Sequence, residues 1–289
     1  MRTELPTKEH RAVATCPPPP VPKEKDHPVR SAIAVSGVPG AVLARNEPTA
    51  VDKALLGLGI VAPLVYAASD VIAGSRWEGY SFRDQTISEL NAIGSPTRTL
   101  TIVLGLVGYS LLIGFGVGVW RSASLNRRLR VVGAALVLLG LNALWSVPFG
   151  SMHVREAEES LTDTLHLVGL PIAGGLLLVI IGLGAGTFGR RLRLYTAATV
   201  LVTLVFSAWS GMDGAAIADN LATPWVGVKE RIAVYSYQLW LVVFAIAVLG
   251  RRLAARANGR TKDAVAQEPT TVGSEPKVAV CSTRDERAA

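Results

Sequence analysis

The stretch that decides the fold is "LTIVLGLVGYSLLIGFGVGVW", residues 100–120, which contains no charged side chain. A bilayer's hydrocarbon core is about 30 Å thick, and a helix that crosses it needs about 20 mostly apolar residues. Asp70 is the one charge in five further runs of this kind, which lie at residues 54–74, 131–149, 167–187, 194–212 and 232–250. Buried helices of soluble proteins carry regular polar stripes, which these runs lack. The sequence therefore predicts an all-α, polytopic integral membrane protein, a six-transmembrane-helix bundle.

The composition of the chain agrees with this class. Of 289 residues, 50% are hydrophobic and 18% charged, which is more apolar than an ordinary soluble domain. We expect one transmembrane domain over residues 53–250 between two disordered tails, a Pro-rich tail at 1–52 and a polar tail at 251–289, because neither can bury enough apolar surface to fold. One cysteine lies in each tail, at Cys16 and Cys281, so that no disulfide framework or cysteine metal site is expected.

Basic residues alternate between rich and poor connections. The rich set follows the second, fourth and sixth spans and consists of Arg121, Arg127, Arg128, Arg130, Arg190, Arg191, Arg193, Arg251, Arg252, Arg256, Arg260 and Lys262. Cytoplasmic connections carry an excess of Lys and Arg, which predicts a multi-pass protein of the cell membrane with both termini cytoplasmic. Topology and attraction to the lipid bilayer thus explain the net charge of +7, and no nucleic-acid partner is expected.

The three long polar connections, residues 75–99, 150–166 and 213–231, all fall on the opposite, outer side. We therefore expect a polar vestibule there. Asp70 is a candidate by itself, because a carboxylate inside a span is costly unless it is paired, protonated or facing water; the alternative is that it reaches the lipid headgroups. Interfacial anchoring is the alternative for the Tyr and Trp residues. The expected vestibule residues are Asp70, Tyr80, Ser88, Glu89, His153, Glu156, Asp163, His166, Asp213, Arg231, Tyr235 and Gln238.

Three segments together resemble a known family. They are the loop "GYSFRDQTISELNAIGSP", the stretch from "MHVRE" to "LTDTLHLVG", and "ERIAVYSYQLWLVVFAIAVL" near the end. Over residues 54–250 the chain is similar to the membrane-protein family described as domain of unknown function 998. The resemblance implies about six spans and a membrane location, and it supplies no catalytic residue.

Several patterns allow more than one chemistry. His153 and Glu156, and Asp163 and His166, are each three residues apart and are weak candidates for a divalent metal site. The alternative is that Thr162 or Asp163 caps the fourth span, with His166 as the partner of Asp163. Hydroxyls such as Ser88 beside Glu89 invite a hydrolase, but no G-x-S-x-G elbow is present. We predict no cofactor.

Small residues mark two of the spans. Gly114 and Gly118, and Gly182 and Gly186, are four apart, which allows close helix contact and makes self-association through these faces an expectation.

Three functions remain open at this point. The first is binding, transport or sensing of a small ligand or proton at the outer vestibule. The second is an intramembrane metal-dependent enzyme that acts on a lipid or hydrophobic substrate, and the third is a scaffold or assembly subunit with no site.

Overall fold

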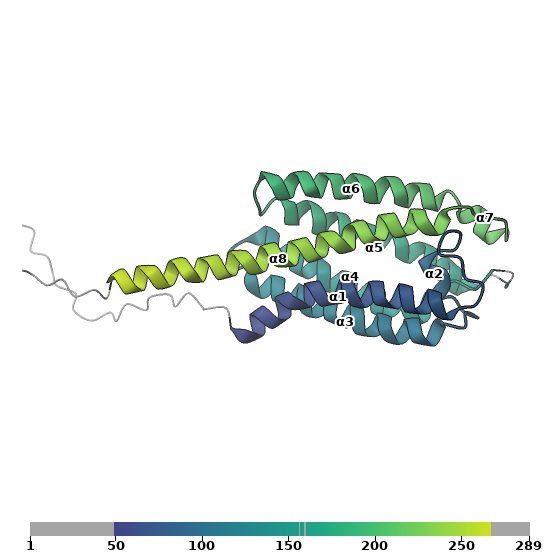
Figure 1. Cartoon of the computed structure of the whole chain (residues 1–289), viewed down its shortest axis with the longest axis horizontal. Coiled ribbons are helices and arrows are strands. Elements are labelled where there is room, and N and C mark those ends of the chain that lie inside the picture. The colour runs from purple at the N-terminus through teal and green to yellow at the C-terminus, as the bar shows by residue number, and fades with distance from the viewer. Residues whose placement is uncertain (1–48, 156, 159, 267–289) are drawn as a thin grey trace, which may run out of the picture. The chain divides into compact units, whose positions relative to one another are not determined.

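The computed structural model describes residues 49–155, 157, 158 and 160–266 (Figure 1). The described residues are helical and contain no strand. Six helices are long and apolar enough to cross a membrane, α8 being counted to Ala254, so the all-α prediction with six span-length helices is confirmed. Most of both predicted tails, Cys16, Cys281 and Glu156 lie outside the described residues. The helices are α1 (Ala50–Arg76), α2 (Ile87–Leu90), α3 (Arg98–Ser122), α4 (Arg127–Phe149), α5 (Leu161–Ala185), α6 (Arg190–Gly211), α7 (Gly214–Ala218) and α8 (Val226–Ala266).

Helix starts differ from the starts of the apolar runs. α5 begins at Leu161 and α8 at Val226, each about two turns before its apolar run, and α8 continues past the expected span end to Ala266. The N-cap of α5 is Ser160, with Asp163 as the third helical residue of a capping box, and not Thr162 or Asp163 as expected. A helix begins where a side chain satisfies its free N–H groups, whereas hydropathy marks only the part that lies in lipid.

The long helices pack in a closed order. α1 contacts α3 and α8, α3 contacts α4, α4 contacts α5, α6 contacts α8, and α5 and α6 complete the ring. Glycines allow the closest of these contacts: a Cβ added to Gly118 would lie 2.8 Å from the Cβ of Leu55 on α1, and one added to Gly133 would lie 2.6 Å from the backbone N of Trp120. Gly114 and Gly118 thus pack within the chain, and self-association through either glycine pair stays a prediction.

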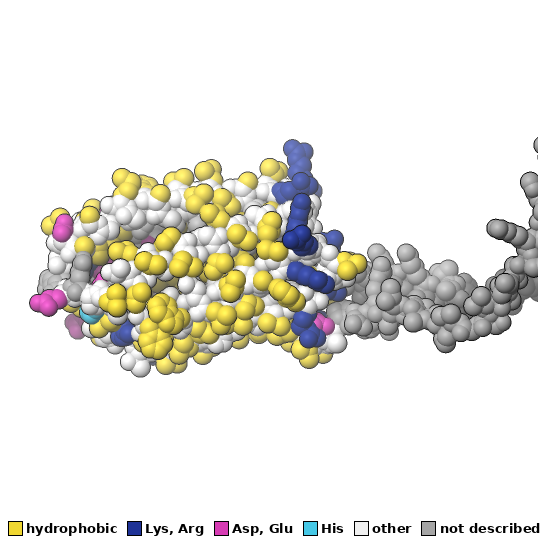
Figure 2. Space-filling model, turned by 180° about the vertical axis from the view of Figure 1, so that it is seen from behind, with side chains coloured by type: hydrophobic (Ala, Val, Ile, Leu, Met, Phe, Trp, Pro, Cys, Tyr) yellow, Lys and Arg dark blue, Asp and Glu magenta, His cyan; other side chains and the backbone are white. Residues whose placement is uncertain are grey.

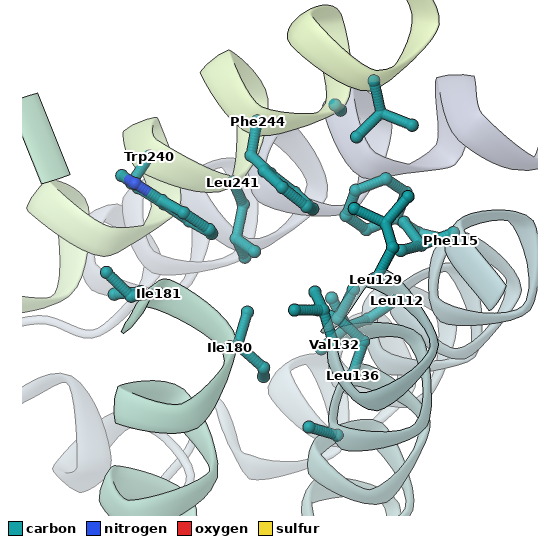
Figure 3. Close-up of a cluster of buried hydrophobic side chains, with 14 of the residues drawn as sticks. Leu112, Phe115, Leu129, Val132, Leu136, Ile180, Ile181, Trp240, Leu241 and Phe244 are labelled. Atoms are coloured by element: carbon teal, nitrogen blue, oxygen red, sulfur yellow. The ribbon is translucent and has the colours of Figure 1, made fainter. Parts of the chain in front are cut away.

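Buried aromatic and aliphatic side chains form a core between the long helices (Figure 3). The ring of Trp240 stacks on Phe244 at 4.8 Å between centroids, and Phe115 meets Phe244 edge-on at 6.2 Å. The indole N–H of Trp240 donates to Thr196 Oγ1 at 2.9 Å. Ile180 of α5 is fully buried beside these rings. Ala62 and Leu112 belong to this core and also line the cavity described below, so the core lies next to that cavity.

The two ends of the bundle differ in charge (Figure 2). Lys and Arg form a dark-blue band at one end, here called the arginine end, and acidic side chains gather at the opposite end, here called the α2 end because it holds α2 and α7. At the α2 end, four basic side chains form salt bridges with carboxylates. They are Arg83 with Asp84, Arg155 with Glu89, Lys229 with Asp213, and Arg231 with Asp70.

Candidate binding cavity

The connection between α1 and α3 folds across the α2 end and is fixed there by α2. Thr86 caps α2 in a capping box with Glu89, and the backbone of Gly79 and Gly94, with φ of +82° and +94°, makes turns that favour glycine. At the other end of α2, Asn91 Nδ2 donates to Val147 O at 3.0 Å and to Ser151 Oγ at 2.9 Å. α2 is therefore held against α4.

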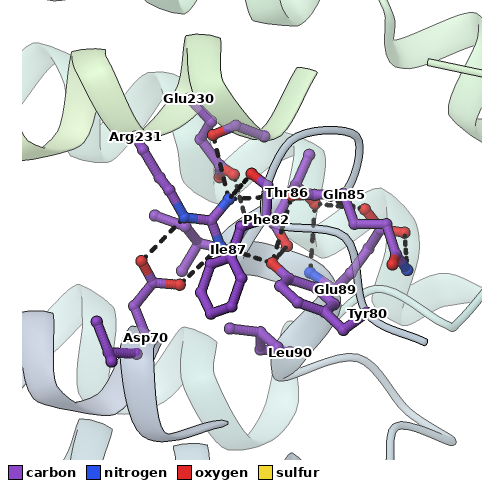
Figure 4. Close-up of polar contacts among 12 residues, drawn as sticks. Asp70, Tyr80, Phe82, Gln85, Thr86, Ile87, Glu89, Leu90, Glu230 and Arg231 are labelled. Carbon is purple, nitrogen blue, oxygen red and sulfur yellow. Dashed lines mark hydrogen bonds and ion pairs between the residues drawn. The ribbon is translucent and has the colours of Figure 1, made fainter. Parts of the chain in front are cut away.

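Asp70 is paired in the structure (Figure 4). Its carboxylate is 2% exposed as a residue and accepts two bonds from Arg231, Nε to Oδ2 at 3.0 Å and Nη2 to Oδ1 at 2.8 Å. The hydroxyl of Tyr235 also donates to Oδ2. Since a bidentate guanidinium and a hydroxyl compensate the buried charge, Asp70 joins α1 to α8 and has no need of a ligand.

Arg231 uses its remaining donors on the α1–α3 connection. Nη1 donates to the carbonyls of Phe82, Gln85 and Gly227 at 2.9, 3.1 and 3.2 Å, and Nη2 donates to Tyr80 Oη at 2.7 Å. The guanidinium also lies over the ring of Phe82, 4.9 Å from its centroid. Burial raises the pKa of the Tyr80 hydroxyl, against the lowering effect of the guanidinium, so this group stays protonated and donates to Thr86 O at 2.8 Å.

A second ion pair, between Arg155 and Glu89, lies where three connections contact one another. Arg155, which sequence reasoning left out of the vestibule, donates from Nε to Glu89 Oε1 at 2.7 Å. Its terminal nitrogens reach Leu221 O at 3.1 Å and Thr223 Oγ1 at 2.8 Å. The α1–α3, α4–α5 and α7–α8 connections therefore meet at one guanidinium.

Asp84 holds the entry to α8. It accepts the backbone N–H of Trp225 at 3.0 Å and pairs with the Arg83 guanidinium, which lowers the pKa of this carboxyl to about 2. The charge is therefore present over the whole ordinary pH range.

The histidines do not meet Asp163 as expected. Asp163 accepts the Nδ1–H of His153 at 2.7 Å and the backbone N–H of His153 at 2.8 Å, while His166 Nδ1 lies 3.1 Å from Gly150 O. A carbonyl only accepts, so Nδ1 of His166 carries the proton. Among the residues that the structure describes, no three His, Cys, Asp or Glu side chains are grouped to hold a metal ion.

A cavity of about 290 Å³ lies beneath α2. Four of the expected vestibule residues line it, Asp70, Ser88, His166 and Gln238, while Tyr80, Glu89, His153, Asp163, Asp213, Arg231 and Tyr235 do not. Sequence reasoning missed several polar side chains that line it from inside the spans. They are Tyr66 and Ser69 of α1, Tyr109 of α3, Asn142 and Ser146 of α4, and Glu230 and Tyr237 of α8.

Many of these polar groups lack a partner within the protein. The Ser146 hydroxyl is buried and has no hydrogen bond, and none links the side chains of Tyr66, Tyr109, Tyr237, Asn142 or Gln238 to any described residue. Glu230 accepts the Ile87 N–H, and Ser88 Oγ lies 3.5 Å from its other oxygen. An unmet hydrogen-bonding group away from bulk water is costly, so the cavity can accept polar atoms of a bound molecule.

Comparison with known proteins gives a family. The family model described as "Protein of unknown function (DUF998)" matches residues 60–247. The chain belongs to this family. That confirms the resemblance found in the sequence, and the matched range contains every residue that lines the cavity. No curated protein and no solved structure matches the chain.

Proposed function

We propose that this member of the DUF998 family binds a small polar organic molecule in the cavity beneath α2, as a receptor or transporter does. The observation that carries the proposal is the set of unpartnered polar side chains that four spans, α1, α3, α4 and α8, contribute to one cavity in the membrane-spanning part of the chain. Its volume equals that of about ten liquid waters and lies at the small end of the usual range for ligand sites.

The Ser146 hydroxyl is buried without a partner, which has a cost that binding would offset. A hydroxyl or amide that leaves water without a new partner costs roughly 1–3 kcal/mol in protein mutational data. Apolar residues of similar size would fill the same space at no such cost. A ligand with hydroxyl, amide or charged groups supplies the missing partners, which favours binding over a purely structural role for these residues.

We also propose how the chain is oriented in the membrane. We place the α2 end outside and the arginine end, with both termini, in the cytoplasm of the cell membrane. The arginine-end residues lie in short connections, where the positive-inside rule applies, and most basic side chains of the α2 end are paired with carboxylates. The cavity then admits its ligand from the outer side.

Cysteine accessibility tests the cavity before any ligand is known. In a chain with Cys16→Ser and Cys281→Ser, we expect Ser69→Cys, which lines the cavity, to react with neutral methyl methanethiosulfonate. The matched control is Ser110→Cys, which is exposed on the lipid-facing side of α3, where a thiol does not ionise.

A second change tests whether the reaction occurs in the cavity. Gly108→Leu should block it, because an added Cβ would meet Val65 at 3.5 Å, an ordinary contact, and the side chain would occupy the cavity. Equal inertness of Ser69→Cys and Ser110→Cys would overturn the proposed function.

A further inference from the structure

We propose that the ligand is a small organic cation, an amine or quaternary ammonium, whose charge pairs with Glu230 and lies among the rings of Tyr66, Tyr109 and Tyr237. The inference rests on the proposed function and names the chemical class of its ligand.

Glu230 is a carboxylate that lines the cavity and has no salt bridge with any described residue. Two carboxylates line the cavity, and Asp70 is engaged by Arg231 and Tyr235. Among the described residues, the partners of Glu230 are the Ile87 N–H and, at 3.5 Å, the Ser88 hydroxyl. A carboxylate at this depth is costly unless it is paired, protonated or facing water, and a cationic ligand would pair it.

Among the described residues, no Lys or Arg forms a salt bridge with Glu230. The residues that line the cavity include no Lys or Arg. The nearest guanidinium, that of Arg231, already donates from each of its three nitrogens to Asp70, Tyr80 and three carbonyls. His166 carries a proton on Nδ1, so that its Nε2 is an acceptor whenever the ring is neutral. The cavity therefore favours positive charge.

Three tyrosines supply the second feature. Tyr66, Tyr109 and Tyr237 come from α1, α3 and α8 and line the same cavity. Tyr66 and Tyr237 both lie within electrostatic range of Glu230. Aromatic faces attract an ammonium group through their quadrupole, and more strongly where water is excluded. A carboxylate with several aromatic rings is the combination that distinguishes an organic cation from a neutral ligand of the same size.

Charged methanethiosulfonate reagents test the inference directly. In the Ser69→Cys chain we expect the reagent with a trimethylammonium group to react faster than the reagent with a sulfonate group. Each rate is divided by the rate of the same reagent at Ala222→Cys, an exposed position of the same end, and the ratio of the two normalised rates is compared. A carboxylate that lines the same cavity as the thiol should make this ratio about tenfold or more. Glu230→Gln keeps an oxygen for the Ile87 N–H but removes the charge, and should lower the ratio toward one. Glu158→Gln, an exposed acid of the same end, should leave it unchanged.

A second measurement keeps the inference falsifiable if Glu230→Gln does not fold. Tetramethylammonium should slow the modification of Ser69→Cys, Tyr109→Phe should retain this protection, and Tyr109→Leu should reduce it severalfold, because phenylalanine keeps the aromatic face. Equal normalised rates for the cationic and anionic reagents, or protection that survives Tyr109→Leu, would overturn the inference. If the neutral reagent alone still reacts, the proposed cavity stands and the ammonium ligand falls; if no reagent reacts, both fall.

Discussion

At the residue scale, we predict that the buried ion pair of Asp70 and Arg231 stabilises the folded protein. Removing one partner of a buried ion pair costs about 3–5 kcal/mol, because the other charge stays buried. Asp70→Asn should therefore lower the free energy of unfolding in detergent by an amount in this range. Arg231→Met should cost more, since it also frees the carbonyls of Phe82, Gln85 and Gly227. Arg83→Gln removes an exposed pair and should change little; equal effects of Arg83→Gln and Asp70→Asn would contradict this role.

Asp84 gives a pH prediction at the same scale. Its folded-state pKa of about 2 lies below the ordinary Asp value of about 3.9, so its stabilising effect is complete above the ordinary value and is lost as the pH falls through about 2. The amide resonance of Trp225, whose N–H bonds to Asp84, should shift with a midpoint near pH 2. Asp84→Asn should abolish that shift, and a midpoint near pH 4 would show that the pairing with Arg83 has no effect in solution.

Residue types in the spans carried a usable signal for the cavity. Tyr66 and Asp70, and Asn142 and Ser146, place polar groups on single faces of apolar helices, because residues four apart share a face. The sequence does not show which polar side chains bond to one another. Asp163 could bond to either histidine, and the choice of His153 follows from the path of the α4–α5 connection.

At the element scale, α2 covers the cavity, and the side chain of Asn91 at its C-terminal end bonds it to α4. Asn91→Ala removes its bonds to Val147 and Ser151, so we expect faster modification of Ser69→Cys beneath it. The same change at Asn126, the N-cap of α4 at the arginine end, should cost about 1 kcal/mol of stability without altering cavity access. Equal modification rates in the two variants would exclude α2 as a cover.

Hydropathy predicted the six long helices because lipid requires apolar length, and this is a local property of the sequence. It could not predict α2, where four residues form a helix against α1 and α8. Arg155 was missed for the same reason. Its partners lie 66 and 68 residues away along the chain, at Glu89 and Thr223, and nothing in its local sequence indicates either.

At the scale of the whole molecule, charge pairing strengthens the difference between the two ends. At the α2 end, four basic side chains form salt bridges with carboxylates. At the arginine end, the described residues form one salt bridge, between Arg121 and Asp52. A surface rich in carboxylates at the α2 end raises the local concentration of cations there. The same distribution of charge thus supports both the orientation that we propose and the ligand class.

The last prediction is the orientation itself. We expect Ala157→Cys, exposed in the α4–α5 connection, to be labelled by a membrane-impermeant maleimide in intact cells, and Ala254→Cys, exposed at the arginine end of α8, only after permeabilisation. Replacing Arg127, Arg128 and Arg130 with Gln weakens the cytoplasmic signal of one connection and should produce a mixed population in which both cysteines are partly labelled. Glu78→Gln, an exposed acid at the α2 end, is the control, because acidic residues contribute little to the rule. Labelling of Ala254→Cys in intact cells would reverse the topology and place the cavity on the cytoplasmic side.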